Sequence, residues 1–106
     1  MKNLRGRDDL LEGVTALKLT DLPNIGPVLA EHLRAAGIET VEQLRELGAE
    51  GAFERIRRSA KPDVCLHELE ALAGAVAGIR KSLLPPERKA ALKAWFHRLT
   101  EEEKHV

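Results

Sequence analysis

The residues best suited to bind a ligand form a short turn and the start of the helix that follows it: Asn24, Ile25, Gly26 and Val28, with Pro27 between the last two. Asn and Gly tolerate positive φ angles, so Asn24 and Gly26 predict a tight reversal of the chain. Proline fits the first position of a helix because its φ is already helical. Free backbone N–H groups at such a helix start, where the helix dipole is positive, make the four residues candidates for binding an anion.

The charges around this turn do not favour a firm contact with DNA. Within residues 18–38 the basic and acidic side chains cancel, these being Lys18, Arg34, Asp21 and Glu31. Lys and Arg contacts to phosphate supply most of the non-specific affinity for DNA, so a neutral turn lacks that contribution. Two interpretations therefore stay open: the turn docks two helices against each other, or it contacts nucleic acid.

Basic residues elsewhere in the chain support the nucleic-acid interpretation. They form two clusters in the sequence, Arg55, Arg57, Arg58 and Lys61 in the first and Arg80, Lys81, Arg88, Lys89 and Lys93 in the second. Such clusters are more commonly the solvated face of a helix. The chain has 17 basic and 17 acidic residues, so no overall positive field attracts nucleic acid or an anionic membrane. The clustered residues are the DNA-binding candidates.

No residues in the sequence form a pattern typical of catalysis. The four histidines are scattered, and Glu68 and Glu70, two positions apart, would point to different faces of a helix. Phosphate-binding glycine loops and nucleophile motifs are missing. The single cysteine, Cys65, excludes an intramolecular disulfide and a multi-cysteine metal site, and we expect it to be buried as a small apolar residue. The sequence therefore predicts no enzyme, no cofactor, no metal site and no small-molecule substrate.

The composition predicts a single all-α domain. A chain of 106 residues has the length of one domain. Aromatic residues make up 3% of it, so Leu, Ile, Val and Ala must form the core, which favours helices over strands. No apolar run approaches the roughly 20 residues of a membrane span, and the first residues do not resemble a secretory signal. We therefore expect a cytoplasmic protein without a membrane contact.

Apolar spacing and capping residues predict a compact bundle of five to six short helices that positions the turn and the basic clusters. The predicted segments are Leu19–Leu22, Pro27–Ala36, Val41–Leu47, Ala49–Arg58, Val64–Lys81 and Glu87–Leu99. Thr40 and Gln43 predict a capping box before the third segment, while Gly37 and Gly48 are placed to end helices. Asp63 is the predicted cap of the longest segment, which we expect to be the central core helix.

The sequence also predicts how two glycines are used and where the helical domain begins and ends. Gly74 and Gly78 lie inside the longest predicted helix, where a helix crossing close to the backbone would explain them; a homodimer face is the alternative. Residues 1–18 form an N-terminal extension with a short helical stripe, residues 19–99 form the helical domain, and residues 100–106 form a polar tail.

The turn and its flanking segments resemble a helix-hairpin-helix. The hairpin of that motif presents backbone N–H groups to a phosphate, and the resemblance implies non-specific DNA binding. In hairpins that grip DNA, a Lys or Arg commonly follows the proline or lies one helical turn further on. Here Val28 and Glu31 occupy these two positions.

Over residues 19–96 the sequence also resembles the C-terminal domain of TfoX/Sxy-type competence regulators. The resemblance rests on LPNIGP from Leu22, on Gly37-Ile38-Glu39-Thr40 with Leu44, on Leu47-Gly48-Ala49, and on the rhythm of Leu69, Leu72, Ala75 and Gly78 before Leu84-Pro85. Members of that family usually have an aromatic residue shortly after the glycine of the long helix, where this chain has Ile79, Arg80 and Lys81. Because the mixed N-terminal domain of full-length regulators has no counterpart in the sequence, we expect a stand-alone copy.

This second resemblance implies a helical module with a helix-hairpin-helix or SAM-domain-like fold, associated with the regulation of competence genes. We predict a non-enzymatic module that binds a protein partner or a second copy of itself. The alternative is a DNA-binding regulator that contacts phosphate through the Gly26 hairpin and the basic clusters.

Overall fold

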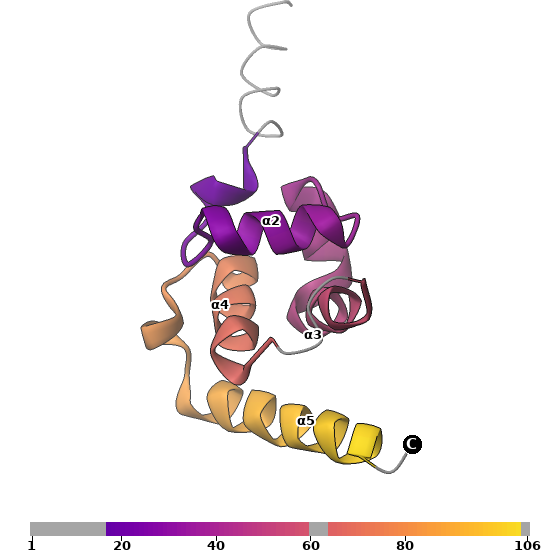
Figure 1. Cartoon of the computed structure of the whole chain (residues 1–106). Helices are drawn as coiled ribbons and strands as arrows, with labels where there is room; N and C mark the ends of the chain where they lie inside the picture. The colour runs from indigo at the N-terminus through magenta and orange to yellow at the C-terminus, as the bar shows by residue number, and fades with distance from the viewer. Residues whose placement is uncertain (1–16, 60–63, 105–106) are drawn as a thin grey trace, which may run out of the picture.

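Six helical elements follow one another in the structure, a computed structural model that describes residues 17–59 and 64–104 (Figure 1). Two of them are single 3-10 turns, η1 (Leu19–Asp21) and η2 (Lys81–Leu83). Four are α-helices, namely α2 (Pro27–Ala35), α3 (Val41–Ser59), α4 (Leu66–Ala77) and α5 (Pro86–Lys104). The described residues contain no strand, which confirms the all-α prediction.

The predicted number of five to six helices is wrong, since the described part of the chain forms four α-helices. The first predicted helix makes only a 3-10 turn, because Pro23 follows it and disfavours helix in the residue before. The break predicted at Gly48 is confirmed, since this glycine has a non-helical backbone (φ 74°, ψ 174°) and two helical parts meet there at a kink, although both belong to the single element α3. The helical stripe predicted for the N-terminal extension lies outside the described residues, apart from residues 17 and 18.

The turn before α2 leads into the helix at the predicted residue. Asn24 takes a positive φ of 71°, and Gly26, which is extended (φ −92°, ψ −174°), precedes Pro27 as the N-cap. Beyond the last residue of α2, Gly37 takes a φ of 84°, as glycine commonly does after a helix. The predicted start at Pro27 and the predicted role of Gly37 are confirmed.

The capping box predicted before α3 is confirmed. The N–H of Gln43 donates to Thr40 Oγ1 at 3.1 Å. In return, Gln43 Oε1 accepts hydrogen bonds from the backbone N–H groups of Thr40 (3.2 Å) and Glu39 (2.7 Å). These bonds satisfy donors that have no partner inside the helix, so the local sequence fixes where α3 begins.

The end of α4 comes earlier than predicted. Gly78 takes a left-handed conformation (φ 78°, ψ 23°) and ends the helix at Ala77, so Lys81 lies beyond it. The N–H of Ile79 donates to the carbonyl oxygen of Gly74 at 2.9 Å, a bond typical of a helix that stops at a left-handed glycine. The prediction of a helix through Lys81 is therefore wrong, because Gly78 serves as a helix stop and not as an interior small residue.

The start of α4 differs as well. Cys65 is the extended N-cap residue and is exposed, so the prediction of a buried cysteine is wrong. Neighbouring residues of an extended segment point to opposite sides, and here Val64, 5% exposed, enters the core in place of Cys65. Asp63, the predicted cap, lies outside the described residues.

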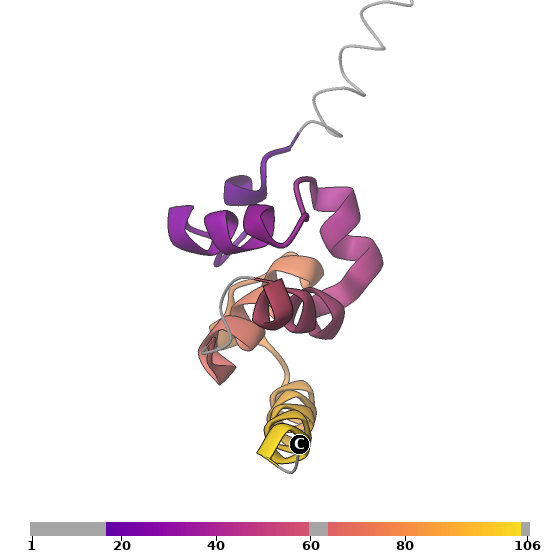
Figure 2. The same cartoon turned by 45° about the vertical axis from the view of Figure 1, so that its right-hand side comes forward.

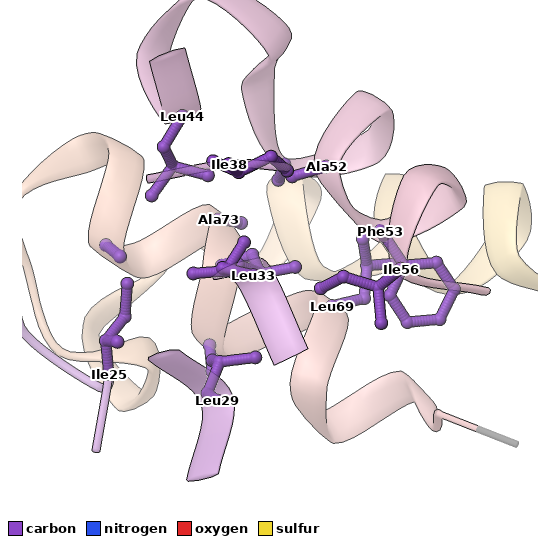
Figure 3. Packing of buried hydrophobic residues seen from close by; sticks show 14 of the residues in the cluster. Ile25, Leu29, Leu33, Ile38, Leu44, Ala52, Phe53, Ile56, Leu69 and Ala73 are labelled. Atoms are coloured by element: carbon purple, nitrogen blue, oxygen red, sulfur yellow. The ribbon is translucent and has the colours of Figure 1, made fainter. Parts of the chain in front are cut away.

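The core lies between α2, α3 and α4. Figure 3 shows Leu33 of α2 among side chains of α3 and α4, including Ile56 and Leu69. The largest fully buried side chains are Phe53, Leu33, Ile38, Leu44, Ile56, Leu69, Leu72 and Leu92. All but one are aliphatic, as the composition predicts. Burying each of them stabilises the fold by about 1.5–3 kcal/mol.

α5 and α2 lie at opposite ends of α4 (Figures 1 and 2). Leu92 of α5 is fully buried, and the rings of Trp95 and Phe96 meet Phe53 edge-on at centroid distances of 6.0 and 5.8 Å. The helix continues to Lys104, beyond residue 99, where the sequence predicts the start of a polar tail. Among residues 17–59 and 64–104, no helix has the length and apolarity needed to cross a membrane.

Candidate functional site

The side chain of Asn24 connects the turn to the C-terminal end of α4. Its Nδ2 donates to the carbonyl oxygens of Ile79 (2.9 Å) and Ala71 (3.3 Å), and its Oδ1 accepts from the backbone N–H of Lys81 (3.0 Å). Asn tolerates the left-handed backbone of this position better than most residues. The turn thus docks on the end of α4 through both polar atoms of one side chain.

Gly74 of α4 makes room for this contact. A Cβ atom built at this position would lie 2.5 Å from Asn24 Nδ2 and 2.7 Å from the carbonyl oxygen of Ile79. The sequence predicts a crossing helix at this glycine. The structure corrects that prediction, because the turn and the chain leaving α4 occupy the space.

The docked turn lies beside Lys81 of η2, which is 57 residues from Asn24 in the sequence. Both residues line a groove of about 280 Å³ between α2 and α4, together with Val28, Leu29, His32, His67, Glu68 and Ala71. We call this the α2–α4 groove. Val28 is 69% exposed there. A cation near the turn could not be predicted from neighbouring residues, because tertiary folding brings Lys81 there.

A second polar contact joins α2 to α4 within this groove. His32 Nδ1 lies 2.8 Å from Glu68 Oε2, and both side chains are partly exposed. Because an ionised carboxylate only accepts hydrogen bonds, the histidine supplies the hydrogen. The described residues contain no group of three His, Cys, Asp or Glu side chains that could hold a metal ion.

The four candidate anion-binding residues differ in exposure. Ile25 is buried (4% exposed), and its N–H donates to the carbonyl oxygen of Leu22 at 3.4 Å. The polar atoms of Asn24 bond to the end of α4. Gly26 and Val28 are exposed, and no side chain caps the start of α2. The face that the turn presents to solvent therefore runs from Gly26 to Val28.

The DNA-binding candidates lie on different sides of the molecule. In Figure 1 the end of α3, which holds the first cluster, is on the right, whereas η2 and the start of α5, which hold the second, are on the left. Lys61 lies outside the described residues. The two clusters therefore belong to different elements of the fold.

Some of these basic side chains make contacts within the protein. Arg88 Nη1 and Nη2 donate to the Glu50 carboxylate at 2.9 and 3.4 Å. Arg58 lies 3.9 Å from Glu54, and the guanidinium of Arg57 is 5.9 Å from the ring centre of Phe53. The remaining described candidates make no ion pair with a described residue, these being Arg55, Arg80, Lys81, Lys89 and Lys93.

The pair between Arg88 and Glu50 predicts a stability contribution that acid removes. The hydrogen bond from Arg88 lowers the pKa of the Glu50 carboxyl. A carboxyl whose pKa is lower in the folded state stabilises the fold above its unfolded pKa, and this contribution is lost as the pH falls through the folded value. Both side chains are more than a third exposed (39% and 34%), which keeps the effect small.

For Glu50→Gln we therefore expect a loss of at most about 1 kcal/mol at neutral pH. The loss should be smaller at about pH 3 than at neutral pH, because the stability contributed by ionised Glu50 is lost as the pH falls from its unfolded pKa through its lower folded pKa. Urea unfolding of both proteins at the two pH values measures it. Equal losses at both would show that the charge of Glu50 contributes nothing.

Two relatives of known name match most of this chain. DNA transformation protein TfoX1 of Aliivibrio fischeri is 30% identical over 92 residues, which cover 87% of this chain and 44% of that protein. Protein Sxy of Escherichia coli K12 is 38% identical over 88 residues, which cover 81% of this chain and 41% of that protein. The chain thus spans less than half the length of either relative.

Two solved structures have a similar fold. An uncharacterised protein from Listeria monocytogenes, in a triclinic crystal form, superposes with a TM-score of 0.77 at 43% identity, covering 79% of this chain and 94% of that one. A Listeria monocytogenes protein of unknown function, in a tetragonal form, gives 0.74 at 44% identity, covering 76% and 98%. Their arrangement of helices is therefore close to the one described above.

The family model of the TfoX C-terminal domain matches residues 15–96. The matched range contains the Asn24 turn, Gly74 and the whole α2–α4 groove. Because the match covers most of the sequence, this protein belongs to the TfoX C-terminal domain family.

Proposed function

We propose that this protein is a non-enzymatic protein-binding module that acts in regulation of the TfoX/Sxy kind. Membership of the TfoX C-terminal domain family supports the regulatory setting, and one relative is named as a DNA transformation protein. In this proposal the module acts in the cytoplasm. η1, the turn and α2 form a helix-hairpin-helix-like unit whose exposed tip meets the partner.

The exposure of Val28 is the observation that carries this proposal. A large apolar side chain, 69% exposed, occupies the position where DNA-gripping hairpins commonly have a Lys or Arg. Such a side chain cannot pair with a phosphate, but it gains free energy when it is buried against an apolar partner surface. The polar side chain of the turn, Asn24, is used inside the fold and not for an outside contact.

DNA binding is the second candidate function. It is favoured by Lys81, which lines the same groove as Val28, and by the neighbouring Arg80, which is exposed. Both could neutralise a phosphate held at the start of α2. Arg57, Arg58 and Arg88 make contacts within the protein, which leaves fewer of the clustered cations for a large DNA footprint.

Titration of a labelled DNA duplex at low salt separates the two functions. We expect no change in anisotropy even at high micromolar protein. Two results together would favour DNA binding over protein binding. The protein would bind the duplex saturably with an affinity that falls steeply with salt, and this salt dependence would become shallower in the double variant Arg80→Glu, Lys81→Glu. The double variant Arg45→Glu, Arg98→Glu, at two exposed positions outside the candidate clusters, changes the net charge by the same amount and is the matched control.

Photo-cross-linking in cells tests the protein contact directly. A photoreactive residue is placed, one variant at a time, at positions 28, 55 and 93, all of which are exposed. We expect a discrete protein adduct from at least one position. Adducts to nucleic acid alone, or none at any position, would contradict a protein-binding module.

A further inference from the structure

An exposed apolar side chain, that of Val28, lines the same groove as Lys81. The large apolar residues that the described part of the chain leaves exposed are Leu17, Val28 and Leu83, at 39%, 69% and 67%. Val28 lines the α2–α4 groove with Lys81, and Leu83 belongs to the same 3-10 turn as Lys81. Val28 therefore shares the groove with this cation, and Leu83 follows the cation two residues later in the chain.

The chain segment that carries Lys81 is positively charged. Residues 79–86 contain Arg80 and Lys81 and no acidic residue. The carboxylate lining the groove, Glu68, is hydrogen-bonded to His32. No described acidic side chain forms an ion pair with Arg80 or Lys81. A ligand that fills the groove therefore meets an unpaired ammonium group next to apolar surface.

The backbone holds Lys81 firmly at this place. Its N–H donates to Asn24 Oδ1 at 3.0 Å, and the same asparagine holds the carbonyl oxygen of Ile79. The side chain of Lys81 is half-buried, so fewer of its conformations remain to be lost on binding. The cation and the apolar side chain of Val28 are thus presented by two elements that are locked together.

We propose that the α2–α4 groove binds an acidic amphipathic segment of a partner protein, with a large apolar side chain over Val28 and a carboxylate paired with Lys81. This inference rests on the proposed protein-binding function and specifies the chemistry of the partner. The groove offers apolar surface next to an unpaired positive charge. An acidic amphipathic helix is complementary to it, because such a helix presents apolar side chains next to carboxylates.

Duplex DNA fits these features less well. Phosphates would satisfy Arg80 and Lys81 but would leave Val28 and Leu83 without an apolar contact. An anionic membrane would meet both requirements, but it is flat, whereas Val28 and Lys81 line a groove between two helices. DNA and anionic vesicles are therefore used as competing ligands in the test.

The probe is a fluorescent helical peptide with leucines along one face and glutamates elsewhere. We expect saturable binding to the full chain, and an affinity at least about tenfold lower for Lys81→Glu and for Val28→Ser. Lys93→Glu, which reverses an exposed cation on α5, should bind like the wild type. Because Val28 is mostly exposed, Val28→Ser folds even if the change at Lys81 disturbs the neighbouring turn. Circular dichroism checks both variants.

Two further peptides define the specificity. A peptide with lysine at every glutamate position should bind the wild type weakly and should regain affinity for Lys81→Glu. A peptide that keeps the glutamates but has serine at every leucine position should not bind. Equal binding of the three peptides, no binding of the acidic peptide, or tighter binding of duplex DNA or anionic vesicles would each overturn the inference.

The cross-linking experiment distinguishes an error in the inference about the groove from an error in the proposed protein-binding function. Protein adducts from photoreactive residues at positions 55 or 93, but not at position 28, would support a protein-binding module that binds elsewhere than at the turn, and would overturn the inference about the groove. Adducts from position 28 support the groove if the cross-linked partner segment is acidic and amphipathic, and a basic or wholly polar segment there overturns it.

Discussion

Gly74→Ala is expected to destabilise the protein by about 3 kcal/mol, although alanine is the better helix former. The added Cβ would lie 2.5 Å from Asn24 Nδ2, 2.7 Å from the carbonyl oxygen of Ile79 and 3.1 Å from the N–H nitrogen of Lys81. Two of these atoms belong to the backbone and cannot rotate away. Relief therefore requires both the turn and residues 79–81 to move away from α4, which breaks the hydrogen bonds of Asn24.

Urea unfolding followed by circular dichroism measures this loss, and Gly51→Ala in α3 is its matched control. At position 51 an added Cβ meets only the side chain of Leu47, at 3.4 and 3.7 Å. We expect this control to leave stability unchanged or to raise it by up to about 1 kcal/mol, because alanine favours the helix. If both variants were equally stable, the close approach at Gly74 would be refuted.

Asn24→Ala is expected to cost about 3 kcal/mol. The substitution removes three hydrogen bonds to the backbone, each contributing about 1 kcal/mol. It also places alanine at a φ of 71°, a conformation that asparagine tolerates better than alanine does. Part of the loss is offset because water can reach the groups set free in this partly buried site.

Asn24→Gly separates the two contributions. Glycine accepts the positive φ but makes none of the side-chain bonds, so this variant should be about 1 kcal/mol more stable than Asn24→Ala. In a double-mutant cycle with Gly74→Ala the losses should fall well short of additive, because the added methyl group no longer meets Nδ2. Strict additivity would show that the two residues do not interact.

The local sequence was sufficient for the features that depend on neighbouring residues. The start of α2 at Pro27, the capping box of Thr40 and Gln43, and the left-handed Gly37 are each set by backbone preferences within a few residues. The aliphatic composition was sufficient to predict an all-α fold. Gly78 shows where local reasoning failed, because a glycine that follows a helix and one inside it look alike in a regular apolar pattern.

The candidate site could be predicted only in part. Val28 was visible in the sequence as an apolar residue where DNA-gripping hairpins commonly have a cation, but its exposure was not. Cys65 was expected in the core because free cysteines usually are, whereas the extended conformation before α4 turns Val64 inward instead. The pairing of Arg88 with Glu50 depends on how α5 packs, so it could not be predicted from the sequence either.

By itself, the sequence determined the helical class, the family and the positions of the turn and most caps, because periodicity, composition and backbone preference act over short stretches of chain. Only the tertiary structure decided what surrounds the turn. Asn24 bonds to residues as many as 57 positions away, and that contact places Lys81 in one groove with Val28. The reason is physical: contacts between distant residues depend on how α2 and α4 pack, which no local preference specifies.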